Sequence, residues 1–188
     1  MDYNKEIRLS YHGGVSFLII EGFFWIATGI LANMVSIKTG IMVIIIGGTF
    51  FYPLGQLAQL ILKRPKISKT NPLKALFTQI GLIIPFSFPL IFMATKENVN
   101  LFFPALTIVT GAHFLPFVYA YKMKTYWVLA SLLVIGGSYF GFMMPGNFNP
   151  CAYYTGILLL LFAIINFYLT KKETWSLHEA GTKIQSFT

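Results

Sequence analysis

The stretch that decides the fold lies near the start of the chain, where residues 13–34 read GGVSFLIIEGFFWIATGILANM. Glu21 is the one charged residue in this stretch. About 20 apolar residues in a helix are enough to cross the hydrocarbon layer of a bilayer, which is ~30 Å thick. The stretch therefore predicts a membrane-spanning helix that carries one carboxyl group.

The rest of the sequence repeats this apolar pattern. Further stretches of similar length follow at residues 40–62, 75–95, 100–121, 126–146 and 151–170. An isolated strand would leave its backbone N–H and C=O groups without partners in lipid, and the alternation of barrel strands is absent, so we expect helices. The sequence predicts an all-α polytopic integral membrane protein: a six-transmembrane-helix bundle forming a single domain over residues 1–188.

The composition excludes a disordered chain and argues strongly against a soluble fold. Charged residues make up 11% of the chain and hydrophobic residues 56%, whereas about a quarter of a soluble domain is charged. The net charge of +8 comes from cations in short loops between the predicted spans, where anionic membrane lipids are the natural partners. No aromatic and basic interleaving accompanies this charge, so we expect no binding of nucleic acid.

The basic residues also predict an orientation, because Lys and Arg in short loops are retained on the cytoplasmic side. Only Lys38 and Lys96 fall on the opposite side of the predicted spans from the rest. The others are Lys5, Arg8, Lys63, Arg64, Lys66, Lys69, Lys74, Lys122, Lys124, Lys171, Lys172 and Lys183. Both termini are therefore expected in the cytoplasm, with the protein in the cell (plasma or inner) membrane. Tyr126, Trp127 and Trp175 are expected to be interfacial anchors.

Polar residues inside the spans provide the best functional signal, since such residues face the bundle interior or a wet cavity. Those in the cytoplasmic halves of the spans are Glu21, Gln56, Gln59, Gln79, His113 and Asn166. Helical spacing adds Trp25 to the face of Glu21 and Tyr52 to the face of Gln56. These residues predict a polar pocket that opens toward the cytoplasm and is closed on the outer side by Phe, Ile and Met.

Glu21 and His113 are the ionisable residues predicted at matching depth in different spans. A direct contact would satisfy both and could exchange a proton near neutral pH. Alternatively, the two residues line one cavity without touching. In a third interpretation Glu21 reaches the headgroup region and His113 is a core residue bonded to a carbonyl. The glutamines could equally connect helices to each other.

The sequence lacks the motifs of known enzyme and cofactor sites. It has no Walker A loop, HExxH, CxxC or GxSxG, and Cys151 is its single cysteine. We therefore assign no catalytic residue and expect no metal and no cofactor. Three functions remain open: transport or binding of a small solute or proton, a structural or accessory subunit, and a lipid-modifying enzyme with His113 as base. The small-molecule ligand is unknown, and a homodimer is plausible because six spans are few for a carrier.

Three short motifs carry a family resemblance. Residues 111–117 read GAHFLPF, residues 121–126 read YKMKTY, and Asn71-Pro72-Leu73 precedes the third span. These motifs resemble the signature of an uncharacterised bacterial multi-span membrane protein family, domain of unknown function family 7010. The resemblance runs from about Phe51 to Met144 and does not reach Glu21. It implies a small multi-span protein of the bacterial cell membrane without an established activity.

Overall fold

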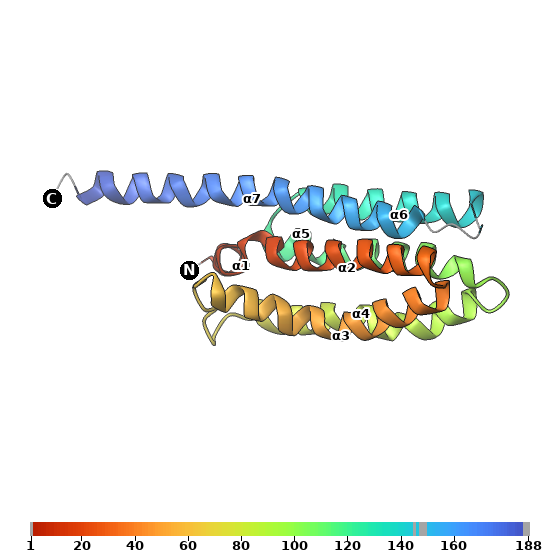
Figure 1. Ribbon diagram of the computed structural model, residues 1–188. Helices are drawn as coiled ribbons and strands as arrows, with labels where there is room; N and C mark the ends of the chain where they lie inside the picture. Colours follow the sequence, from red (N-terminus) through yellow and green to blue (C-terminus); the bar gives the residue numbers. More distant parts are fainter. Residues whose placement is uncertain (1, 145, 147–149, 186–188) are drawn as a thin grey trace.

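The computed structural model describes the backbone of residues 2–144, 146 and 150–185, and the side chains of these residues up to Lys171. Over this part the chain forms helices and no strand (Figure 1). The helices are α1 (Tyr3–Ser10), η1 (His12–Gly14), α2 (Val15–Met34), α3 (Ile37–Ile61), α4 (Leu73–Ala94), η2 (Val99–Leu101), α5 (Phe102–Tyr121), α6 (Thr125–Met143) and α7 (Pro150–Gln185). The predicted all-α fold is confirmed.

Six helical segments are long and apolar enough to cross a membrane. They extend over His12–Met34, Ile37–Ile61, Leu73–Ala94, Val99–Tyr121, Thr125–Met143 and Pro150–Lys171, close to the predicted spans. Residues 145 and 147–149, placed by the sequence at the end of the fifth span and in the next loop, lie outside the described residues. The six predicted membrane helices are confirmed.

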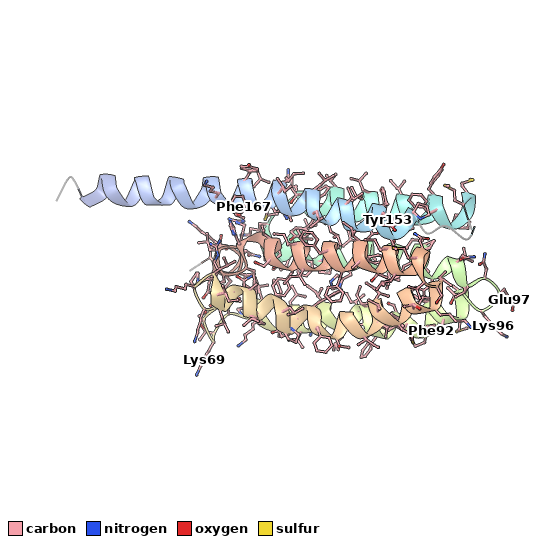
Figure 2. The ribbon with its side chains drawn as sticks, in the orientation of Figure 1. Lys69, Phe92, Lys96, Glu97, Tyr153 and Phe167 are labelled. Carbon is pink, nitrogen blue, oxygen red and sulfur yellow. The ribbon has the colours of Figure 1, made fainter. Side chains whose placement is uncertain are left out.

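The two termini lie at the same end of the bundle, and α7 continues past the other helices at that end (Figure 1). We call this end of the bundle the basic end, because α1, the loop 62–72, the turn 122–124 and Lys171 lie there. Figure 2 shows Lys69 there, whereas Lys96 and Glu97 lie at the opposite end. The side chains of Lys172, Trp175 and Lys183 lie outside the description.

The helices form an open ring. Neighbours in the ring pack closely: α3 on α2, α2 on α7, α7 on α6, α6 on α5, and α5 on α4. In the described part of the chain, the backbones of α3 and α4 hardly approach each other. The same is true of α2 and α5. We call the line where α3 and α4 face each other the α3–α4 seam. The arrangement leaves room in the middle of the ring and one weakly closed side.

Small residues set how closely the helices approach. On α2, Gly22 lies against Gly156 of α7, where a Cβ on either glycine would come within 3.0 Å of the other's carbonyl oxygen. On α3, Gly47 and Gly55 receive the rings of Phe24 and Phe17 from α2. Close backbone approach at glycine is a main source of van der Waals attraction between membrane helices. These contacts therefore fix α2 to both of its neighbours.

Hydrogen bonds attach α1 to the loop that follows α3. The Glu6 carboxylate accepts hydrogen bonds from the Ser68 backbone N–H at 2.6 Å and from the Asn71 side-chain amide at 2.8 Å. The Asn71 side-chain oxygen in turn accepts from the Leu73 N–H at 3.0 Å, at the start of α4. The Asn71-Pro72-Leu73 motif thus joins the beginning of α4 to α1.

The contact between α2 and α7 can be tested with matched glycine variants. Gly156→Ala should lower the free energy of unfolding by about 1–3 kcal/mol, because the new Cβ would lie 2.7 Å from the Gly22 carbonyl oxygen and 2.6 Å from a side-chain carbon of Ile26, so the two helices would have to shift. Gly48→Ala on α3 adds a Cβ that meets no atom within 4 Å, so its stability should be unchanged or slightly higher. Unfolding of both variants in detergent measures the difference. Equal stabilities would contradict the proposed close packing.

The attachment of α1 to the loop 62–72 should depend on pH. Hydrogen bonds from Ser68 and Asn71 hold the pKa of Glu6 below its ordinary value of 4.5. Because the pKa is lowered in the folded state, this stabilisation is complete above pH 4.5 and is lost as the pH falls through the folded-state value. Hydrogen exchange of the Ser68 amide, corrected for its intrinsic rate, should speed up over that range. In Glu6→Gln the corrected rate should be insensitive to pH, and a wild-type rate without pH dependence would refute the account.

Candidate functional site

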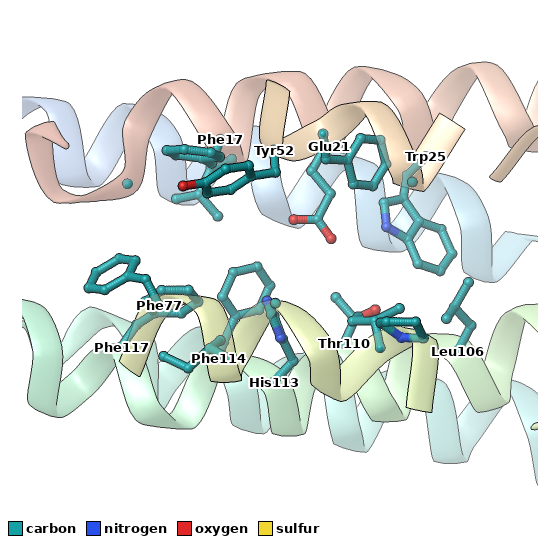
Figure 3. A pocket seen from close by; sticks show the side chains of 18 of the residues that line it. Phe17, Glu21, Trp25, Tyr52, Phe77, Leu106, Thr110, His113, Phe114 and Phe117 are labelled. Atoms are coloured by element: carbon teal, nitrogen blue, oxygen red, sulfur yellow. The ribbon is translucent and has the colours of Figure 1, made fainter. Parts of the chain in front are cut away.

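A cavity of about 380 Å³ lies in the middle of the helix ring, between α2, α3, α4 and α5 (Figure 3). Its wall contains four of the residues that the sequence placed in a polar pocket: Glu21, Trp25, Tyr52 and His113. The lining positions lie in the middle of the spans and in the halves nearer the basic end. Most of the wall is apolar or aromatic, with a few polar groups among the rings. Binding sites for small molecules generally have this composition.

Glu21 projects its carboxylate from α2 into the cavity (Figure 3). Trp25, one helical turn further along, points its indole N–H toward this carboxylate. No Lys, Arg or second carboxylate belongs to the cavity wall as described. Glu21 therefore contributes the negative charge of the cavity whenever its carboxyl group is ionised.

His113 faces Glu21 from the opposite wall, on α5 (Figure 3). Its ring also lies in hydrogen-bonding position against the backbone carbonyl of Ile80 on α4. The buried Nδ1 atom of His113 and the Oγ1 atom of Thr110 have no hydrogen-bond partner among the described residues. Among the described residues, no hydrogen bond or ion pair joins Glu21 to His113. The two residues line one cavity from opposite sides.

An aromatic cluster lies between the cavity and the basic end. Its members are Tyr11, Phe77, Phe117, Tyr121 and Tyr126, whose ring centroids approach to between 5.1 and 5.6 Å in successive pairs. These rings line the end of the cavity at which the sequence predicts an opening toward the cytoplasm. The physical reason is helical periodicity, because Phe117 and Tyr121 follow His113 at intervals of four residues and share its face.

The cavity reaches the surface of the bundle along the α3–α4 seam instead. Tyr52 is 60% exposed, and Gly48 and Thr49 on α3 are exposed as well. On the other side of the seam Gly81 and Pro85 of α4 are exposed lining residues. A Cβ added to Gly48 or to Gly81 would meet no atom within 4 Å. The side of the bundle that faces lipid therefore gives access to the cavity.

The predicted glutamines do not belong to the cavity wall. Gln56 lies near the Tyr11 hydroxyl, with its amide nitrogen 3.4 Å from the oxygen. Gln59 is buried, and its amide atoms have no hydrogen-bond partner among the described residues. Gln79 is exposed on α4. The sequence identified the depth of these amides in the membrane and not the direction in which they point.

Asn166 also lies away from the cavity, at a junction of three helices. Its side chain accepts a hydrogen bond from the Thr125 hydroxyl at 2.8 Å and donates to the Gly13 carbonyl at 3.3 Å. The Tyr126 hydroxyl donates to the same carbonyl at 2.6 Å. Tyr126 is therefore a buried member of the core, which corrects its interpretation as an interfacial anchor, whereas Trp127 is exposed.

Sequence reasoning missed the residues that shape the cavity without being charged. Tyr11, Tyr121 and Tyr126 close one end, and Thr49 and Gly81 lie at the seam. The spacing of Tyr121 from His113 was a usable signal for the first group. Nothing in the sequence identifies the second group, because no local pattern specifies which two helices fail to pack.

The described residues contain no group of three His, Cys, Asp or Glu side chains that could hold a metal ion. Of the residues that line the cavity, Glu21 and His113 have side chains of a type that can bind a metal ion. A stable zinc site generally needs at least three protein ligands. The chemistry of the wall is therefore that of hydrogen bonding, ion pairing and aromatic contact.

The sequence matches the model of a known protein family. The sequence model of a family of unknown function, DUF7010, matches residues 1–169. The chain belongs to the DUF7010 family. The match includes both Glu21 and His113, so it extends beyond the resemblance seen between Phe51 and Met144. No curated protein and no solved structure matches the chain.

The role of Asn166 can be tested by removing its side chain. Asn166→Ala should lower the free energy of unfolding by about 1–3 kcal/mol, since the Thr125 hydroxyl and the Gly13 carbonyl both lose a buried partner. Gln79→Ala, at an exposed position on α4 away from this junction, is the control and should change stability by less than about 0.5 kcal/mol. Denaturation in detergent micelles compares the two. Similar effects in both variants would argue against a structural junction.

Proposed function

We propose that this protein binds a small solute within the membrane, in the cavity between Glu21 and His113, and serves its transport or sensing. The observation that carries the proposal is the cavity itself, which brings Glu21 of α2 and His113 of α5 to opposite walls among apolar and aromatic side chains. A carboxyl or imidazole group in a membrane span is costly unless it faces a polar partner. A polar or charged solute between the two side chains would supply that partner.

The size of the cavity agrees with a small-molecule site. Its volume of about 380 Å³ falls within the range of roughly 300–1,000 Å³ that is usual for ligand pockets. Polar or ionisable groups at this depth in a membrane protein are costly and are generally retained for a function. Glu21, His113 and Thr110 come from two helices, α2 and α5, whose backbones do not approach each other closely. A solute between these helices would contact both.

The proposed orientation places the basic end in the cytoplasm of the cell. Of the cations at this end, Lys5, Lys63, Lys69, Lys122 and Lys124 are on α1 or in short connections between spans. Retention of such cations on the inner side supports this orientation. The cavity then lies nearer the cytoplasmic face, and the aromatic cluster separates it from that face. Passage of a solute into the cytoplasm would require the Phe77 and Phe117 rings, whose centroids are 5.5 Å apart, to separate.

Binding can be measured through Trp25, which lines the cavity and is 1% exposed. The chain has three tryptophans, so replacing Trp127 and Trp175 by Phe leaves Trp25 as the reporter. The probes are cyclohexanol, 2-phenylethylammonium and benzoate, added to the protein in nanodiscs. We expect at least one to change Trp25 fluorescence in a saturable way, and Glu21→Gln or His113→Ala to weaken that binding about tenfold or more.

Glu21→Gln should keep the unfolding temperature of the parent, because among the described residues the Glu21 carboxylate is paired with Trp25 of its own helix. His113→Ala loses the contact to the Ile80 carbonyl on α4 and should fold with an unfolding temperature lower by a few degrees. Gln79→Ala is the matched control and should bind like the parent. Variants that fail to fold, or that fold and bind like the parent, would favour the structural-subunit interpretation over solute binding. Absence of saturable binding by all three probes would likewise count against the proposal.

A further inference from the structure

We infer that the solute is a hydrophobic organic cation that enters the cavity from the bilayer, through the α3–α4 seam. This inference rests on the proposed function and adds the chemical class of the solute and its route. Four features of the cavity support it: its charge, its aromatic walls, its backbone acceptors and the position of its opening.

The charge of the cavity favours a positive solute. Glu21 is the carboxylate of the wall, and none of the lining residues is Lys or Arg. The basic residues of the chain lie at the ends of the helices, outside the lining. A cation in the cavity would therefore gain a counter-charge without facing a like charge, whereas an anion would meet the Glu21 carboxylate. The difference in electrostatic energy between a bound cation and a bound anion is larger in surroundings with a low dielectric constant than in water.

Aromatic faces surround the same carboxylate. Phe17, Tyr52 and Trp25 flank Glu21 on one wall, and Phe114 and Phe117 lie across from it (Figure 3). The negative face of an aromatic ring attracts an ammonium group within about 6 Å of the ring centre, and Trp and Tyr are particularly effective. A carboxylate among several rings is the arrangement that recognises an alkylated or aryl-substituted ammonium group.

Prolines free backbone carbonyls of residues that line the cavity from their usual donors. Proline has no N–H, so it cannot donate to the carbonyl of the residue four positions earlier in its helix. Pro53 removes the usual donor to Thr49, Pro85 removes that to Gly81, and Pro89 removes that to Pro85. Thr49, Gly81 and Pro85 all belong to the cavity wall. Carbonyl oxygens carry partial negative charge, so they too favour a positive solute over an anion.

The position of the opening selects solutes that partition into lipid. The aromatic cluster covers the cavity at the basic end, where Tyr121 and Tyr126 are almost completely buried. Toward the other end Ile44 and Leu106 are buried lining residues. The seam combines exposed lining residues with two glycines, Gly48 and Gly81, beside which a side chain would find room. A hydrophobic cation dissolved in the bilayer reaches this side directly.

The class of solute can be tested with two probes of the same shape. Benzyltrimethylammonium carries a quaternary nitrogen where neopentylbenzene has a carbon atom. Their affinities are measured with the Trp25 reporter in phosphatidylcholine nanodiscs and expressed per mole of lipid, which removes the difference in partitioning. We expect the cation to bind at least about thirtyfold more tightly to the parent, and this preference to fall to about threefold or less in Glu21→Gln.

The outcomes separate the inference from the function on which it rests. Equal binding of the two probes, or tighter binding of neopentylbenzene, overturns the cationic class and leaves solute binding standing. Tighter binding of the cation with the same preference in Glu21→Gln overturns the role of the carboxylate. If neither probe binds and the earlier panel also fails, the proposed function falls together with this inference.

The route can be tested by narrowing the seam. Gly48→Phe and Gly81→Phe place a ring where a Cβ meets no atom, so both variants should fold. We expect the association and dissociation rates of benzyltrimethylammonium to fall by a similar factor of about ten, because a narrowed entrance slows both directions. Ile46→Phe and Leu82→Phe are matched controls on the same helices, at lipid-exposed positions that are 60% and 44% exposed and outside the cavity wall. Stopped-flow fluorescence of the Trp25 reporter measures both rates.

Unchanged rates in both glycine variants, or slowing that is equal in the control variants, would overturn entry through the seam. A loss of affinity with an unchanged association rate would mean that the rings fill the cavity instead of narrowing its entrance, which also overturns the route. The class of solute would stand in either case, because it is tested by the probe pair and not by these rates.

Discussion

The architecture depends on where the helices can approach each other closely and where they cannot. Gly22 of α2 meets Gly156 of α7, and the rings of Phe17 and Phe24 lie over the glycines of α3. In lipid, where apolar surfaces gain little by leaving their surroundings, such close contacts are what hold helices together. They tie α3 to α2, while α4 is held by α5. Since α3 and α4 lack a comparable contact, the ring stays open at the seam and a cavity remains inside it.

The cavity explains how the spans accommodate Glu21, the residue that is most costly to bury in a membrane. A carboxyl group at this depth is unfavourable unless it faces a protein interior or a polar space. Glu21 meets this requirement by projecting into the cavity, opposite His113 and beside the indole N–H of Trp25. The surrounding wall leaves atoms such as Nδ1 of His113 without partners among the described residues.

Buried polar residues elsewhere in the bundle have a different role. Asn166 joins α7 to the Gly13 carbonyl and to the start of α6, and Tyr126 shares that carbonyl. By depth alone Asn166 resembles Glu21, because both are polar residues in the halves of the spans near the basic end. The structure separates them by their surroundings: Asn166 is hydrogen-bonded at a junction of helices, whereas Glu21 projects into the cavity.

The sequence by itself determined the six membrane helices and their bounds to within a few residues, because backbone hydrogen bonding in lipid permits only helices once strands are excluded. Helical periodicity also put Glu21 and Trp25 on a shared face. Only the tertiary structure decided that the faces of Glu21 and His113 enclose one cavity, that an aromatic cluster covers it at the basic end, and that it opens between α3 and α4. The reason is that periodicity fixes which residues of one helix point the same way, while the partner of each face depends on packing between segments far apart in the chain.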